Sequence, residues 1–178
     1  MFAGIRSRTL GITATFTLAC GGLLAPATAH ADASLLSCIG TQTVTYDPPL
    51  TNTAKSTKVT ITEVYTSCTD TAGITSGKGT FQVTETASCT SLNNPLGTQD
   101  QPTYQWNNDK RSTVLFKVTS VVRLGNGTSQ ITAVGTVTQG FGKGSVATRT
   151  VTLPDLNPTA CSGKGVSSQS GPATLTFA

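Results

Sequence analysis

Two glutamates on neighbouring predicted strands are the residues best placed to do chemistry. Glu63 falls on the same strand face as Ile61 and Tyr65, and Glu85 falls on the same face as Val83. If the two strands form a hairpin, the carboxylates lie opposite or diagonal to each other, within about 5–8 Å. Two carboxylates at such a separation are the minimum equipment of a glycosidase. Glu63 and Glu85 are therefore the candidate catalytic pair of a carboxylate-dependent glycoside hydrolase.

The same two glutamates also have a purely structural interpretation. Arg149 is in line with Ala147 and Val151 on a later strand, and its guanidinium could neutralise the carboxylates. Ion pairs of this kind perturb charged groups without any catalytic role. Because the chain holds only eight acidic residues, the sequence favours the structural interpretation over catalysis.

Tyr104 and Trp106 are the candidate ligand-binding residues. They share one face of a short predicted strand, and a row of exposed aromatic rings would give a flat surface for stacking on a sugar. The alternative is a core or rim position, because large aromatic side chains dominate core packing.

The elements that would position these residues begin after a predicted targeting segment. Arg6 and Arg8 precede an apolar stretch, residues 10–25, which leads to Ala29-His30-Ala31. This pattern is typical of a secretory signal peptide, cleaved here after Ala31. The alternative is a lipoprotein signal at Cys20. The sequence thus predicts a single secreted domain, residues 32–178, found outside the cell or at the cell wall, with no membrane span in the mature chain.

Cleavage at that point removes the only histidine, His30. Catalysis by histidine, activation of Ser or Cys by histidine, and histidine-bound zinc are then excluded. The ten basic and eight acidic residues that remain give a charge of +2 with no basic cluster, which argues against nucleic acid. We expect no cofactor and no metal site.

The chain is rich in β-branched residues, and its apolar residues alternate with polar ones along several segments. Both features predict an all-β chain. The predicted strands are Thr41–Tyr46, Thr57–Ser67, Gly79–Ser88, Thr103–Trp106, Ser112–Leu124, Ser129–Thr138, Ser145–Leu153 and Ala173–Phe177. Gly125-Asn126-Gly127 marks a tight hairpin turn, and residues 92–102 read as a long loop. The expected fold is an antiparallel, immunoglobulin-like Greek-key sandwich of seven or eight strands, with a closed β-barrel as the alternative.

Four cysteines follow the predicted cleavage site, and an even number in a small exported chain indicates disulfides. If successive strands run up and down, Cys38 and Cys68 lie at one end of the sheet, and Cys89 and Cys161 lie at the other. A ten-residue strand is about 33 Å long, whereas bridged Cα atoms lie within about 7 Å. The pairs Cys38–Cys68 and Cys89–Cys161 are therefore predicted.

Several short motifs follow one another along the chain in a recognisable order. They are Tyr46-Asp47-Pro48-Pro49-Leu50-Thr51, Ser67-Cys68-Thr69, Ser88-Cys89-Thr90, Trp106-Asn107-Asn108-Asp109 and Ala160-Cys161. Together they resemble a group of small exported all-β proteins of actinomycete bacteria. The resemblance implies export and a β fold, and it assigns no activity and no catalytic residue.

The functional expectation is a non-catalytic extracellular binding or structural module. Loops at one end of a disulfide-braced sheet would contact an extracellular protein, a glycan or a small ligand. A glycoside hydrolase using the two glutamates, or a secreted protease inhibitor, are the alternatives.

Overall fold

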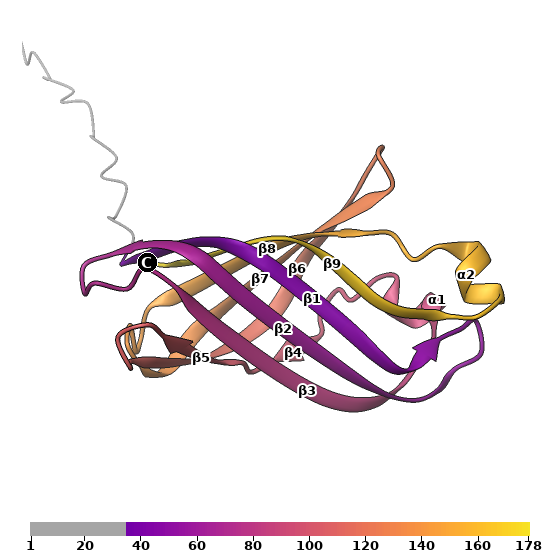
Figure 1. Cartoon of the computed structure of the whole chain (residues 1–178), viewed down its shortest axis with the longest axis horizontal. Helices are drawn as coiled ribbons and strands as arrows, with labels where there is room; N and C mark the ends of the chain where they lie inside the picture. The colour runs from indigo at the N-terminus through magenta and orange to yellow at the C-terminus, as the bar shows by residue number, and fades with distance from the viewer. Residues whose placement is uncertain (1–34) are drawn as a thin grey trace, which may run out of the picture. The chain divides into compact units, whose positions relative to one another are not determined.

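The computed structural model describes residues 35–178, which form an all-β unit (Figure 1). Its strands are β1 (Leu36–Leu50), β2 (Lys55–Asp70), β3 (Gly77–Ala87), β4 (Gln99–Asp100), β5 (Thr103–Trp106), β6 (Arg111–Leu124), β7 (Thr128–Gly140), β8 (Val146–Pro154) and β9 (Val166–Phe177). Two short helices, α1 (Cys89–Leu92) and α2 (Pro158–Ser162), follow β3 and β8. The all-β class and all eight predicted strands are confirmed. The additional strand, β4, lies within residues 92–102, which the sequence analysis predicts to be a loop.

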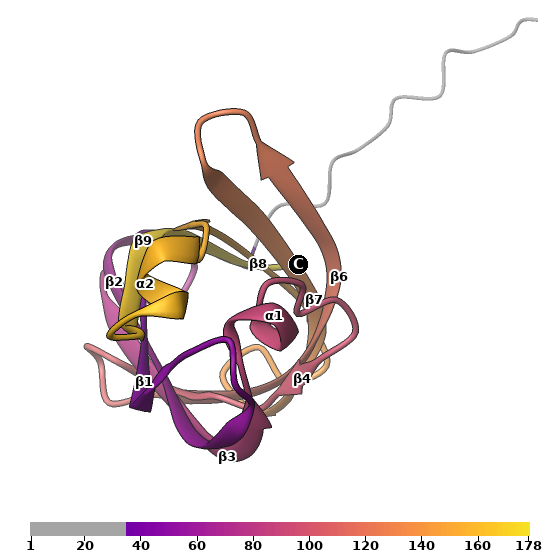
Figure 2. The same cartoon turned by 90° about the vertical axis from the view of Figure 1, so that its right-hand side faces the viewer.

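All the strand pairs are antiparallel, and they join the strands of residues 35–178 into one sheet. The order is β4-β6-β5-β3-β2-β1-β9-β8-β7, and β6 also pairs with β7. The β6–β7 pairing therefore closes the strands from β6 to β7 into a ring around a common interior, and β4 is attached to this ring at β6 (Figure 2). The sequence analysis predicts a sandwich of two packed sheets. One continuous sheet forms instead because long strands twist and coil strongly.

Both predicted disulfides are confirmed. Cys38 and Cys68 face each other in the β1–β2 ladder and are bonded. The second bond joins Cys89 of α1 to Cys161 of α2. The bonds close loops of 30 and 72 residues, and each would stabilise the fold by about 4 kcal/mol if it acts by restricting the unfolded chain.

Aromatic side chains fill the half of the interior nearest Cys38–Cys68. The ring centroids of Tyr65 and Tyr104 are 6.0 Å apart, those of Tyr104 and Trp106 are 5.5 Å apart, and those of Trp106 and Phe177 are 6.2 Å apart. Tyr104 is fully buried and Trp106 is 4% exposed. The prediction of an exposed aromatic surface at these two residues is therefore wrong, and the alternative of a core position is confirmed.

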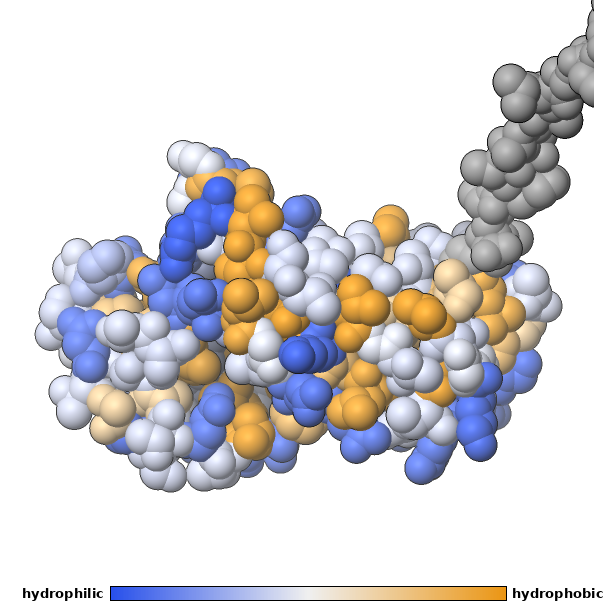
Figure 3. All heavy atoms as spheres, turned by 180° about the vertical axis from the view of Figure 1, so that it is seen from behind, coloured by the Kyte–Doolittle hydropathy of each residue, from blue (hydrophilic) through white to orange (hydrophobic). Residues whose placement is uncertain are grey.

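The tip of the β6–β7 hairpin projects outward from the ring of strands (Figures 1 and 2). The tip is the predicted turn, in which Gly127 adopts a φ of +77° that favours glycine. An apolar strip runs along this hairpin on the face seen in Figure 3, and the exposed apolar residues of β6 include Val122 and Leu124.

The predicted signal peptide, with its cleavage at Ala31 and the alternative site at Cys20, lies outside the described residues. From residue 35 to the C-terminus, no helix has the length and apolar character needed to cross a bilayer.

Candidate ligand-binding site

A buried ionic cluster crosses the middle of the interior. Glu63 of β2 is 1% exposed, and its Oε1 accepts a hydrogen bond of 2.7 Å from Nη1 of Arg149 on β8. Nη2 of Arg149 donates a second bond, also 2.7 Å, to Oδ2 of Asp100 on β4. The Arg149 guanidinium also lies 4.5 Å from the ring centroid of Phe116, a cation–π contact. Arg149 on β8 thus contacts residues of three other strands, β2, β4 and β6.

Two tyrosines complete the hydrogen bonding of Glu63. The hydroxyls of Tyr65 and Tyr104 donate to Glu63 Oε2 at 3.0 and 2.6 Å. Tyr104 lies on β5, and it reaches Glu63 across Gly79 of β3, which is the register partner of both residues. A Cβ added to Gly79 would lie 2.6 Å from the Tyr104 ring. Glycine is therefore required here so that the tyrosine can pass over β3.

Burial and the Glu63 carboxylate govern the pKa values of the groups around it. For Tyr65 and Tyr104, loss of solvation raises the pKa well above its ordinary value, and the negative charge of Glu63 raises it further. Burial on its own would lower the pKa of Arg149, but Glu63, Tyr104 and Asp100 outweigh this effect and raise it. Arg149 therefore remains a cation, and both tyrosines remain neutral donors.

The structure separates the two glutamates that the sequence proposed as a catalytic pair. Glu63 is opposite Gly79, whereas Glu85 is opposite Thr57. The six register positions between them correspond to about 20 Å along the ladder, so the expected separation of 5–8 Å is wrong. Both oxygens of Glu63 are occupied by donors, and the alternative in which Arg149 neutralises this residue is confirmed.

A cavity of about 200 Å³ occupies the other half of the interior, beyond the ionic cluster. Its walls are mainly aliphatic side chains from strands on opposite sides of the ring, with Arg149 and Asp100 among the polar lining groups. Val44, Val59 and Ile61 come from β1 and β2, and Val118 and Leu153 come from β6 and β8. The cavity thus has aliphatic walls and a polar floor, which is formed by Gln42, Asp100 and Arg149.

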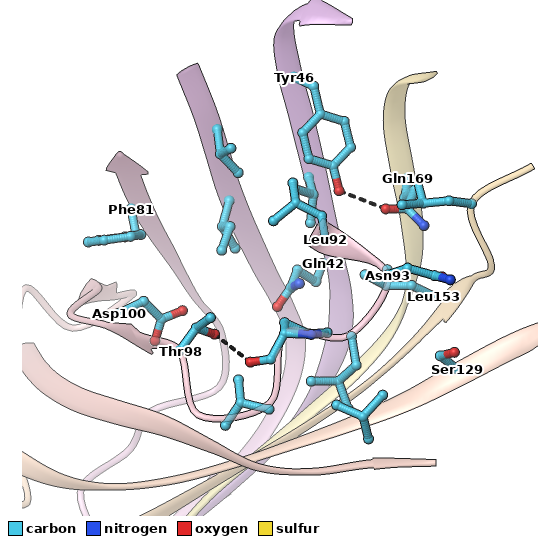
Figure 4. A pocket seen from close by; sticks show the side chains of 18 of the residues that line it. Gln42, Tyr46, Phe81, Leu92, Asn93, Thr98, Asp100, Ser129, Leu153 and Gln169 are labelled. Atoms are coloured by element: carbon cyan, nitrogen blue, oxygen red, sulfur yellow. Dashed lines mark hydrogen bonds between the residues drawn. The ribbon is translucent and has the colours of Figure 1, made fainter. Parts of the chain in front are cut away.

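The last residue of α1, Leu92, and the segment between α1 and β4 border this cavity, as Figure 4 shows for Leu92, Asn93 and Thr98. On the opposite side, the Tyr46 hydroxyl donates a 2.7 Å hydrogen bond to Oε1 of Gln169. Some lining residues, among them Glu85, are exposed, so the cavity is open to solvent on their side. Burial raises the pKa of Tyr46, and the nearby charge of Glu85 raises it further.

The sequence analysis does not single out Gln42 and Asp100, which form the polar floor of the cavity together with Arg149. Gln42 lies in a threonine-rich strand where its inward direction follows from alternation alone, which would have been the one available signal. Asp100 lies in the predicted loop, where no periodicity applies. Residues 35–178 contain no group of three His, Cys, Asp or Glu side chains arranged to hold a metal ion.

Comparisons with known proteins provide no relative on which to base a function. No family model, no curated protein and no solved structure matches this chain.

Proposed function

We propose that this chain is an exported, non-catalytic binding protein that takes a small, mainly apolar molecule into its interior cavity. The observation that carries the proposal is the aliphatic lining of the 200 Å³ cavity, combined with its connection to solvent. Proteins bind small molecules in concave, mainly apolar sites with a few fixed polar groups. An apolar cavity of about 150 Å³ can hold benzene, so this one suits a single ring with a short chain, or a short alkyl chain.

The construction of the fold supports a role in binding. Strands on all sides of the cavity are linked through one hydrogen-bonded sheet, and two disulfides fasten its ends. A rigid, preformed site loses little conformational freedom when its ligand binds. The carboxylates proposed for hydrolysis, by contrast, are far apart along the ladder, so the arrangement of residues favours binding over glycoside hydrolysis.

Export from the cell is part of the same proposal. Disulfides persist in oxidising surroundings outside the cytosol, and this chain contains two of them. From the sequence side, the predicted signal peptide ending at Ala31 and the resemblance to exported actinomycete proteins support the proposal, and the location that we propose is outside the cell or at the cell wall. An extracellular small molecule is the partner that we favour over a protein or a glycan.

Calorimetric titration with butylbenzene tests the binding function. We expect saturable one-site binding to the purified chain with its disulfides intact. Ile61→Trp places a large side chain in the cavity and should abolish binding. Val64→Trp, on the same strand but 43% exposed on the outer face, is the matched control and should bind like the wild type. No saturable binding to the wild type, or equal binding to the folded Ile61→Trp variant, would exclude this function.

A further inference from the structure

The polar floor of the cavity contains two acceptors without partners. Gln42 is 6% exposed, and its Oε1 is buried without a hydrogen-bond partner among the described residues. Oδ1 of Asp100 is also buried without a hydrogen-bond partner, whereas Oδ2 of Asp100 accepts a hydrogen bond from Arg149. Buried polar atoms in proteins are nearly always paired. Two unpaired acceptors in one cavity therefore need a common explanation.

Both acceptors belong to the lining of the cavity. Gln42 and Asp100 are lining residues, and Figure 4 shows them projecting into the pocket from β1 and β4. Gln42 is the direct register partner of Glu63 in the β1–β2 ladder, and Asp100 is linked to Glu63 through Arg149. The unpaired acceptors thus flank the same ionic cluster, at the polar floor.

The charge of this cluster is unbalanced. Two carboxylates, Glu63 and Asp100, share a single guanidinium, Arg149, which leaves one net negative charge. Glu85 adds a further carboxylate to the lining nearer the solvent, and the remaining lining carboxylate, Asp155, is paired with Arg123 at 3.4 Å. Arg149 is the only cation of the lining, and its two bonds are directed to Glu63 and Asp100.

We propose that the natural ligand is a cationic amphiphile, a small apolar body with a primary ammonium head that binds between Gln42 and Asp100. This inference rests on the binding function proposed above. An ammonium group carries three donors and no acceptor, so it can satisfy both unpaired oxygens at once. Its positive charge balances the excess carboxylate of the cluster, and its apolar body contacts the aliphatic walls. A ligand with a carboxylate head would instead bring two more acceptors and a second uncompensated negative charge to the same floor.

A series of phenylbutyl compounds with different head groups tests this assignment. Calorimetric titration of the wild-type chain compares phenylbutylamine, phenylbutanol, phenylbutyrate and butylbenzene. We expect the amine to bind about ten- to a hundredfold more tightly than butylbenzene, as hydrogen bonds to charged groups imply. The alcohol should fall between the amine and the hydrocarbon, and the carboxylate should bind most weakly.

Two variants locate the head group. Asp100→Asn removes the charge at the floor, and Gln42→Leu removes the neutral acceptor. Each should reduce the ratio of amine affinity to butylbenzene affinity, by about tenfold for Asp100→Asn. Asp109→Asn is the matched control, because it removes one carboxylate from an exposed turn where φ is +62°, a backbone angle that asparagine tolerates. It should leave the ratio unchanged.

The outcomes separate this inference from the function on which it rests. If butylbenzene binds but the amine binds no more tightly than the alcohol or the carboxylate, the cationic ligand is excluded and the binding function stands. The same conclusion follows if both Asp100→Asn and Gln42→Leu keep the wild-type ratio. If butylbenzene does not bind, the binding function is excluded, and the inference that rests on it is excluded with it.

Discussion

Replacing Glu63 by glutamine should destabilise the fold far more than the same change at Glu85. Glu63 is buried and accepts three hydrogen bonds, one of them from Arg149. Removing one partner of a buried ion pair costs about 3–5 kcal/mol. Glutamine keeps the shape of the side chain, and Arg149 keeps its bond to Asp100, so we expect the lower end, about 3 kcal/mol.

Thermal unfolding without reducing agent measures this difference. In a domain of this size each kcal/mol changes Tm by about 2–4 °C, so Glu63→Gln should lower Tm by about 6–12 °C. Glu85 is exposed, and Glu85→Gln should change stability by no more than about 0.5 kcal/mol. Equal effects of the two substitutions, or a loss below about 1 kcal/mol at Glu63, would refute the account of the ionic cluster.

Three further predictions follow from the packing. Because burial raises the pKa of all three tyrosines, the stability they contribute is complete below their unfolded pKa of about 10 and is lost as the pH rises above it. Tyrosinate absorbance should therefore appear only with alkaline unfolding, and a normal titration of the folded protein would contradict this. Gly79→Ala should cost about 1–3 kcal/mol through overpacking against Tyr104, measured by urea unfolding, whereas Gly125→Ala, which meets no atom within 4 Å, should be nearly neutral. Replacing Cys89 and Cys161 together by serine should lower the unfolding free energy by about 4 kcal/mol, and an unchanged urea midpoint would show that this bond does not constrain the unfolded chain.

The disulfide pairing could be deduced from the sequence because it depends only on the direction of successive strands. Cys38 and Cys68 flank the first predicted hairpin, and Cys89 and Cys161 lie at the opposite end after strands that run the same way. The missed strand β4 has only two residues and does not disturb this order. Because the deduction uses only the direction of the strands, it stays valid when the predicted strand boundaries are wrong by several residues.

The site was harder to predict because it depends on register. Alternation placed Glu63 and Glu85 on the inward face of their strands, but it does not say how far along the ladder each residue lies. A β2–β3 connection of six residues, Thr71–Ser76, sets that offset. A shift of register changes the cross-strand partner of every residue. The strands were therefore predicted correctly, whereas the predicted pairing of Glu63 with Glu85 is wrong.

The sequence by itself determined the β character of the chain, the limits of most strands and the partners of its four paired cysteines, since these follow from local periodicity and strand direction. Only the tertiary structure decided that the sheet returns on itself, that Arg149 crosses to Glu63 and Asp100, and that a cavity remains beside them. These features arise from side chains that meet across the interior from strands distant in the chain. Local pattern carries no information about the space left between such strands.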